Sequence, residues 1–512
     1  MNNSTRVVVN TGFLYANMLV NIVVQLIAVR LVYNALGEVD WGIFNLIAGV
    51  IALFGFLNVA MAAATQRYLS FAIGSGDKEL LKETFYYSVV LHITIGVIVL
   101  IMLEIVGMYY VNNILDAPRE RLEVTRSLFH FITISTCVNI ITVPYEADIN
   151  ANEKMGAIAL INILDSLMKL GVALYIGHSA FDKLFVYGLL TMSCIVLTLI
   201  LKRVYCIMHF SESHFRWHKI KDMKLMRSIS SFALWNLIGS GCSMARYQGT
   251  GMLLNSSFKI LINASYGTAQ QVNGLLNFFA NTIVRAIRPQ IVKSEGANNR
   301  ERMLRLSCTT CKITSLMVAL LAVPMYIEMP FILHVWLNKE IPVDTLIFCR
   351  YFLVIVFIYQ MTIGLQVAIE SVGKIKLLQI IVGTMHILAL PAGYVCFRLG
   401  CPPYSIMLCI VAEEIIALVS RSLICRKLTG LSLKIFYTKT IIPVSLSVIL
   451  IFLACDTVRN KIFTEGWIEF FSITLLSTTL ICLVSYKWIL SKEERHTINS
   501  LVSKLKNKIL KK

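Results

Sequence analysis

Long apolar segments recur along the whole chain, and this recurrence limits its fold more than any other feature. Each segment is close to the about 20 residues that an α-helix needs to cross the hydrocarbon core of a bilayer. With 57% hydrophobic residues, 15% charged residues and a mean hydropathy of +0.72, the 512-residue chain is far more apolar than a soluble protein. Because helices satisfy their own backbone hydrogen bonds in lipid, we predict an all-α membrane protein.

The apolar segments predict about fourteen transmembrane helices. The predicted spans are residues 11–33, 41–63, 85–110, 123–144, 157–177, 184–206, 230–253, 265–285, 310–333, 345–369, 377–397, 403–424, 440–456 and 467–487. The outer loops are too short to form a folded catalytic domain, and the chain has no phosphate-binding GxxxxGK[ST] sequence. We therefore predict a protein that is not an enzyme, has no cofactor and binds no metal.

Lysine and arginine are concentrated in alternate loops, which orients a membrane protein. The basic clusters lie at residues 209–227, 285–312, 421–439 and 487–512, all on one side of the predicted topology. Basic loops stay in the cytoplasm, so both termini are predicted to be cytoplasmic. The net charge of +18 is thus explained by topology, and we expect no nucleic-acid partner.

The second half of the chain repeats the first when it is shifted back by about 220 residues. Residues 66–70 (QRYLS) align with 290–294 (QIVKS), and residues 153–155 (EKM) align with 373–375 (GKI). Aligned positions lie on the same side of the membrane, which predicts two parallel six-helix lobes with the substrate site between them. The predicted parts are an N-terminal lobe (1–210), a basic cytoplasmic linker (211–229), a C-terminal lobe (230–428), two further transmembrane helices (429–490) and a basic cytoplasmic tail (491–512).

Five short motifs make the chain similar to a known family. They are QRYLSF at residues 66–71, GSGD at 74–77, NANEKM at 150–155, NASYG at 263–267 and RPQI at 288–291. In this order they resemble the polysaccharide-exporter branch of the multidrug/oligosaccharidyl-lipid/polysaccharide transporter superfamily, whose typical members are Wzx-type O-antigen flippases. The resemblance covers nearly the whole chain and implies a MATE-like fold that works by alternating access.

The same resemblance implies a function. It implies a flippase of the bacterial inner membrane that moves a polyprenyl-pyrophosphate-linked oligosaccharide to the outer leaflet, for O-antigen, lipopolysaccharide or other surface polysaccharide biosynthesis. The implied partners are this lipid-linked oligosaccharide, membrane lipids, a polysaccharide polymerase and a chain-length regulator. A multidrug or small-molecule exporter of the same superfamily is the alternative. Exporters of cationic drugs need acidic cavities, whereas the first span has no acid and the seventh carries Arg246.

Charged residues within spans are the first candidates for the site, because burying a charge in a bilayer is costly. Arg246 has no acid in its own span. It either faces a cavity and binds pyrophosphate, as a guanidinium does well, or pairs with a carboxylate such as Glu413 or Glu414. A cavity-facing Arg246 predicts that Arg246→Ala stops transport without lowering protein levels. Lys169 either attracts phosphate as well or pairs with Asp165, one helical turn away.

Polar stripes supply further candidate residues. The eighth span carries Asn273, Asn277, Asn281, Arg285 and Arg288 at helical spacing, and the first span carries Asn21, Gln25 and Arg30. These residues either bind the sugar and diphosphate or hydrogen-bond to neighbouring helices. Arg67, at the cytoplasmic mouth of the second span, either receives the diphosphate or reaches the lipid headgroups. The candidate coupling residues are Asp165, Glu413, Glu414 and His92.

The predicted topology can be tested at His214, in the basic linker. A single reactive cysteine at His214 should react with a membrane-impermeant maleimide only after the cells are permeabilised. A cysteine at Ser179, in a predicted outer loop, is the matched control and should react in intact cells. Labelling of the His214 position in intact cells would reverse the assigned orientation.

Overall fold

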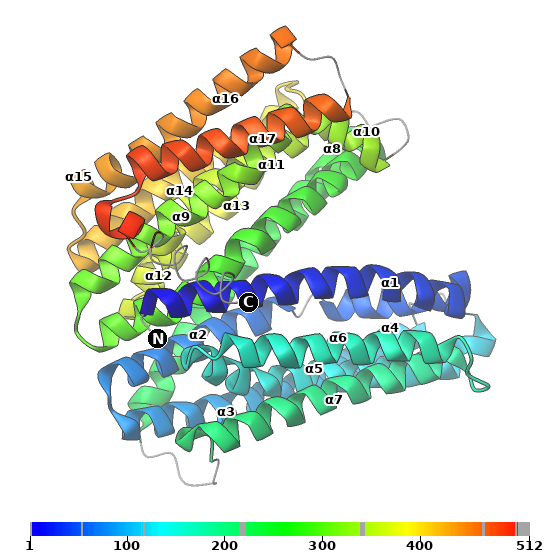
Figure 1. Ribbon diagram of the computed structural model, residues 1–512. Helices are drawn as coiled ribbons and strands as arrows, with labels where there is room; N and C mark the ends of the chain where they lie inside the picture. Colours follow the sequence, from blue (N-terminus) through cyan, green and yellow to red (C-terminus); the bar gives the residue numbers. More distant parts are fainter. Residues whose placement is uncertain are drawn as a thin grey trace, which may run out of the picture. The chain divides into compact units, whose positions relative to one another are not determined.

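The computed structural model describes residues 3–52, 55–113, 115, 118–214, 222–337, 344–462, 466–496 and 499. These residues are almost entirely helical, which confirms the all-α prediction (Figure 1). Nine of the described helices are long and apolar enough to cross a membrane, or ten if the bent pair α11 and α12 is one span. The chain divides into two compact units, one of residues 8–240 with 296–298 and one of residues 1–7, 241–295 and 299–512.

The unit of residues 8–240 and 296–298, which we call the N-terminal unit, holds the first seven helices and the start of the eighth. α1 bends at Gly37, whose φ of 78° lies in the left-handed region that glycine adopts readily. Its helices are α1 (Asn3–Ala52), α2 (Gly55–Ser75), α3 (Lys78–Met102), α4 (Met108–Asn113), α5 (Leu122–Ala151), α6 (Met155–Ile176) and α7 (Lys183–His209).

The second unit, which we call the C-terminal unit, contains the rest of α8 and the helices that follow it. Aromatic and aliphatic side chains of α8, α9, α11 and α14 form one large buried cluster in this unit. Its helices are α8 (Met223–Gly296), α9 (Arg300–Ile327), α10 (Met329–Leu337), α11 (Thr345–Gln360), α12 (Ile363–Val372), α13 (Lys376–Arg398), α14 (Ser405–Thr429), α15 (Leu433–Phe436), α16 (Ile442–Ile462) and α17 (Trp467–Val484).

Two predicted spans differ in detail from the structure. Residues 254–264, predicted as a loop, have helical backbone within α8 and contain no glycine or proline. The chain nevertheless reverses there, because the Tyr266 hydroxyl donates to the Tyr247 carbonyl at 3.2 Å, whereas a straight helix would separate these residues by about 28 Å. The span predicted at 345–369 corresponds to α11 and α12 taken together, which are bent by 43°.

The turns between helices support the predicted repeat. Glu153, in the turn after α5, has a φ of 59°, and the aligned Gly373, directly after α12, has a φ of 84°. Gly76 and Asn298, also about 220 residues apart, have φ values of 74° and 56°. Each is followed by an acid or amide that caps the next helix, since Asp77 accepts from the Leu80 amide and Asn299 from the Arg302 amide, both at 3.0 Å. The two halves therefore use the same turn geometry at matching positions.

An arginine joins three helices at one end of the N-terminal unit. Arg121, just before α5, donates from Nε to Asp40 of α1 at 2.9 Å and from Nη1 to Asp182, just before α7, at 2.5 Å. The planar guanidinium can bind two carboxylates at once, so this residue fixes the three helix ends relative to one another. In the predicted topology this end faces outward.

The last two helices, α16 and α17, pack against α9. Their contact is apolar along α9, through Ala319, Val323 and Ile327. At the end of α9 the fully buried Glu328 lies 3.7 Å from Arg459 of α16, which also donates to Glu469 of α17 at 2.6 Å. The two helices are thus held by both hydrophobic contact and a buried ion pair. The predicted division at residues 211–229, 429–490 and 491–512 stays a prediction, and part of the linker and most of the tail lie outside the described residues.

The Arg121 contact predicts a pH dependence of stability. Burial raises the pKa of Asp182, but the hydrogen bond and the charge of Arg121 lower it by more. The pKa of Asp182 therefore lies below its ordinary value. A lowered pKa in the folded state stabilises the protein above the unfolded value of about 4, and this contribution is lost as the pH falls through the folded value. Asp182→Asn should therefore lower the unfolding free energy by about 1 kcal/mol at pH 7.

Thermal unfolding in detergent at pH 7, 5 and 3.5 tests this prediction. The difference in thermal stability between Asp182→Asn and the wild type should be equally large at pH 7 and pH 5, and it should become smaller at pH 3.5. Glu123→Gln, at an exposed acid of α5, is the control and should change little at any pH. A difference that does not depend on pH would mean that the Asp182 charge is not the stabilising feature.

Candidate functional site

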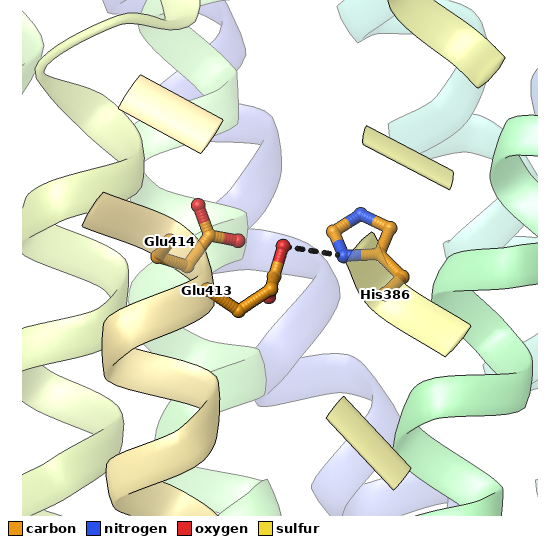
Figure 2. Close-up of side chains that lie close together, drawn as sticks. All are labelled: His386, Glu413 and Glu414. Atoms are coloured by element: carbon orange, nitrogen blue, oxygen red, sulfur yellow. Dashed lines mark ion pairs between the residues drawn. The ribbon is translucent and has the colours of Figure 1, made fainter. Parts of the chain in front are cut away.

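Four charged or titratable side chains meet inside the C-terminal unit. Glu413 and Glu414 come from α14, His386 from α13 and Arg246 from α8 (Figure 2 shows the first three). His386 Nδ1 lies 3.0 Å from Glu413 Oε1, and Arg246 Nη1 contacts both Glu413 and Glu414, the latter at 3.3 Å. All four side chains are buried, so each charge depends on its neighbours for stabilisation.

The position of the two glutamates on α14 explains why they bind different partners. Neighbouring residues of a helix point about 100° apart, so Glu413 and Glu414 leave α14 in different directions. Glu413 reaches His386 and Arg246, whereas Glu414 lies between Arg246 and Arg421, both at 3.3 Å. Arg421 is two turns after Glu414 on the same helix face, which brings its guanidinium back to the carboxylate.

Polar contacts continue from Arg421 along the unit. The Arg421 guanidinium lies over the Tyr359 ring, 4.9 Å from its centre, and donates to the Thr362 hydroxyl at 3.3 Å. The Tyr359 hydroxyl donates to Gln366 at 3.4 Å. Gln366 donates to Glu370 at 3.0 Å, and Glu370 pairs with Arg288 of α8 at 2.9 Å. We call this whole set the buried charge network: Arg246, Arg288, Tyr359, Thr362, Gln366, Glu370, His386, Glu413, Glu414 and Arg421.

His386, Glu413 and Glu414 have the spacing of a metal site, because one ligand atom from each lies within 4.8 Å of the others. A divalent cation needs carboxylates with charge to spare. Here Arg246 and Arg421 already balance the two glutamates, and Arg246 contacts both of them. Adding a metal ion would leave excess positive charge in a buried region, so the donor set does not suit a divalent cation.

Arg246 and Lys169 both contact carboxylates, as in the alternative in which each of them pairs with an acidic residue. Arg246 contacts Glu413 and Glu414, and Lys169 Nζ lies 2.8 Å from Asp165 Oδ2 within α6. Asp165 also accepts from Thr198 of α7 at 3.1 Å. Contact of either cation with substrate stays a prediction, but neither is an uncompensated charge.

The stripe on α8 divides between buried and exposed residues. Asn273 is buried and accepts from Asn277 at 2.8 Å, so these two amides satisfy each other within the helix. Asn281 and Arg285 are exposed, and Arg288 pairs with Glu370. The structure thus brings one end of the stripe into the buried charge network.

The candidates on α1 and α2 differ in exposure. Asn21 accepts from Ser166 of α6 at 2.6 Å and therefore links two helices. Gln25 and Arg30 are exposed, and no carboxylate among the described residues pairs with Arg30. Arg67 is buried against aromatic rings, 4.4 Å from the centre of Tyr68 and 4.8 Å from that of Phe71. Such cation–π contacts stabilise a guanidinium away from water.

His92 has a structural partner. Its Nδ1 lies 2.6 Å from the carbonyl of Ser88, one turn earlier on α3, and its ring is buried. Six residues of the network were not among the predicted site residues, namely Arg421, Tyr359, Thr362, Gln366, Glu370 and His386. The seven-residue spacing of Glu414 and Arg421 was a signal for the first of them, since it places opposite charges on one helix face.

The pairing of Arg246 changes the expected effect of its removal. Arg246→Met leaves two buried carboxylates with less compensation, which should destabilise the protein by about 3 to 5 kcal/mol and lower its level in the membrane. Adding Glu413→Gln to this variant restores the charge balance and should recover much of the lost thermal stability. Arg426→Gln, at an exposed arginine of α14, is the control. Wild-type stability of Arg246→Met would show that the pairing contributes little.

Comparisons with known proteins identify the fold. Residues 14–174 match the MatE family model, and a search of curated proteins found no match. An outward-facing multidrug resistance MATE family transporter of the MOP superfamily is similar, with a TM-score of 0.72, 15% identity and coverage of 84% of this chain and 96% of that one. A MATE protein in the bent conformation is similar at a TM-score of 0.71 and 14% identity, with coverage of 84% and 96%.

A third similar structure is a MOP superfamily transporter from Pyrococcus furiosus, whose binding pocket is described as having reverse polarity. It has a TM-score of 0.71, 15% identity and coverage of 84% of this chain and 96% of that one. All three identities are low, so they establish the fold alone. The chain is therefore a multi-pass membrane protein with the fold of the MATE transporters, a fold consistent with transport by alternating access.

Proposed function

We propose that the protein is a flippase that moves a polyprenyl-pyrophosphate-linked oligosaccharide from the cytoplasmic to the outer leaflet by alternating access. The proposal places it in the bacterial inner membrane with both termini in the cytoplasm. Its cargo would be used for surface polysaccharide biosynthesis, with a polymerase and a chain-length regulator acting afterwards. The transporter fold supports the general activity, and the charges of the spans support an anionic cargo.

The observation that carries the proposal is the pairing of acidic residues. Apart from Glu123, the exposed first residue of one span, the acids of the twelve predicted lobe spans are Glu104, Asp165, Glu328, Glu413 and Glu414. Each lies within 4 Å of a basic side chain, from His130, Lys169, Arg459, Arg246, His386 or Arg421. Four of these five acids thus have an arginine or lysine partner, whereas the basic partner of Glu104 is His130, which is charged only when protonated. Arg30, in contrast, is exposed and pairs with no described carboxylate.

Coupling residues remain part of the proposal. Among the candidate coupling residues, Glu413 and Glu414 are the best placed to affect several helices, because they lie in a network that joins α8, α13 and α14. Asp165 is paired within α6, and His92 binds its own helix, so these two have local partners. A change in the charge of Glu413 or Glu414 would alter contacts between helices, which is what coupling requires.

A multidrug exporter is the second candidate. One of the similar structures is a multidrug resistance MATE family transporter, and that likeness in fold favours this candidate. It would require an acidic group that can pair with a cationic drug. Apart from Glu104, such a group in the described lobe spans would have to be taken from an existing ion pair, at a cost in stability.

Reconstitution into liposomes distinguishes the two candidates. The probes are a polyprenyl-pyrophosphate-linked oligosaccharide with a fluorescent sugar label, read by an impermeant quencher, and the cationic dye ethidium. We expect movement of the first probe at least about tenfold faster than in protein-free vesicles, a difference of about 1.4 kcal/mol in the barrier, and no acceleration of ethidium. Transport of ethidium alone would overturn the proposal in favour of drug export.

Arg30 supplies a matched test within the same assay. Arg30→Gln removes an exposed cation from α1 and should slow the diphosphate probe by about tenfold, since an Arg–phosphate contact contributes about 1.5 kcal/mol or more. Arg126→Gln, at an exposed arginine of α5 that donates to Asn112, is the control and should not change the rate. An unchanged rate in Arg30→Gln would remove this residue from the proposed site.

A further inference from the structure

We propose that Arg421 is a positioning residue that holds the bend between α11 and α12 and links it to the buried charge network. The bend of 43° lies between Gln360 and Ile363. Arg421 contacts the ring of Tyr359 before the break and the hydroxyl of Thr362 within it. The same guanidinium pairs with Glu414. The charge state of the network and the shape of the broken helix therefore share one side chain.

The local sequence does not by itself account for the bend. Sharp bends in helices usually occur at proline, at small residues or where a side chain replaces a backbone hydrogen bond. Residues 358–363 contain neither proline nor glycine, and the nearest glycine, Gly364, lies in the first turn of α12. Instead, the amides of Met361 and Thr362 bond to carbonyls three residues back, both at 3.2 Å, and the Gln360 carbonyl accepts from Thr314 of α9 at 3.2 Å. Contacts from α9 and α14 therefore maintain the broken conformation, and a change in those contacts can alter it.

The segments beside the break are anchored. A Cβ at Gly364 would lie 2.0 Å from the backbone oxygen of Ser307, so the start of α12 packs directly on the backbone of α9. Gln360 is fully buried, and its side-chain amide has no hydrogen-bond partner among the described residues. An unsatisfied buried amide costs free energy, so the bent state is one that the surrounding contacts must hold in place. Arg421, which is 2% exposed, supplies such contacts.

The link to the site runs through Glu414. Arg421 and Arg246 bind its two different carboxylate oxygens, each at 3.3 Å. If Arg246 leaves Glu414, for example to contact an anion, the carboxylate has only Arg421 as its charged partner. The stronger attraction would draw Arg421 toward Glu414 and away from Thr362 and Tyr359. Only this last step rests on the proposed function, because it takes the anion to be the cargo.

Hydrogen exchange of the full-length protein in lipid nanodiscs tests the positioning role. The variants are Arg421→Lys, which keeps the charge near Glu414 but not the planar group over Tyr359, and Thr362→Val, which removes only the hydroxyl. Both should keep nearly wild-type thermal stability. Both should also raise amide exchange in residues 359–366 by about tenfold, as expected from the loss of one buried charge-assisted hydrogen bond. Arg426→Gln is the control.

Wild-type exchange at residues 359–366 in both variants would overturn the proposal. Exchange that rises throughout the C-terminal unit would also overturn it, since that pattern indicates general destabilisation. In the liposome assay, Thr362→Val should lower the maximal rate of the diphosphate probe without changing its half-saturating concentration. A wild-type protein that does not move the probe would refute the proposed cargo, whereas the exchange result would still decide the role of Arg421.

Discussion

The cost of placing charge away from water governs how this protein is built. In the C-terminal unit, Arg246, Glu413, Glu414 and Arg421 are all nearly inaccessible, and each has a partner of opposite charge. Their contacts connect α8 and α14, and His386 adds α13 through Glu413. Because removing one member leaves another unpaired, the packing of these helices depends on the set as a whole. Such a set can change state by exchanging partners or by a change in the charge of one member.

Helix content followed directly from the sequence, because only helices can satisfy the backbone of so many long apolar segments in lipid. Exact helix ends did not. The helical backbone of residues 254–264, at the reversal within α8, reflects a lack of helix-breaking residues, which the hydropathy pattern does not report. The break after Gln360 depends on Thr314 and Arg421, which are distant in sequence, so periodicity alone could not locate it.

The sequence indicated several residues of the candidate site, but it did not indicate which of them contact one another. Arg246, Glu413 and Glu414 stood out as charges in apolar spans, and their mutual pairing was one of the alternatives considered. Tyr359 and Gln366 carried no such signal, because aromatic and amide residues are common in helices of this kind. Their role became visible only when α11 and α12 placed them between Arg421 and Glu370. The pattern of charges thus indicated which residues matter, and the fold indicated which of them act together.

The contact between Glu328 and the last two helices has a consequence for the architecture. Those helices lie outside the sequence repeat, which suggests an addition to a twelve-helix transporter. Glu328 is nevertheless fully buried, and Arg459 of α16 is its partner. A chain ending at Thr429 would lack Arg459 and the apolar surface of α16 and α17 that covers α9. The two C-terminal helices are therefore part of the packing of the C-terminal unit and not a separate attachment to it.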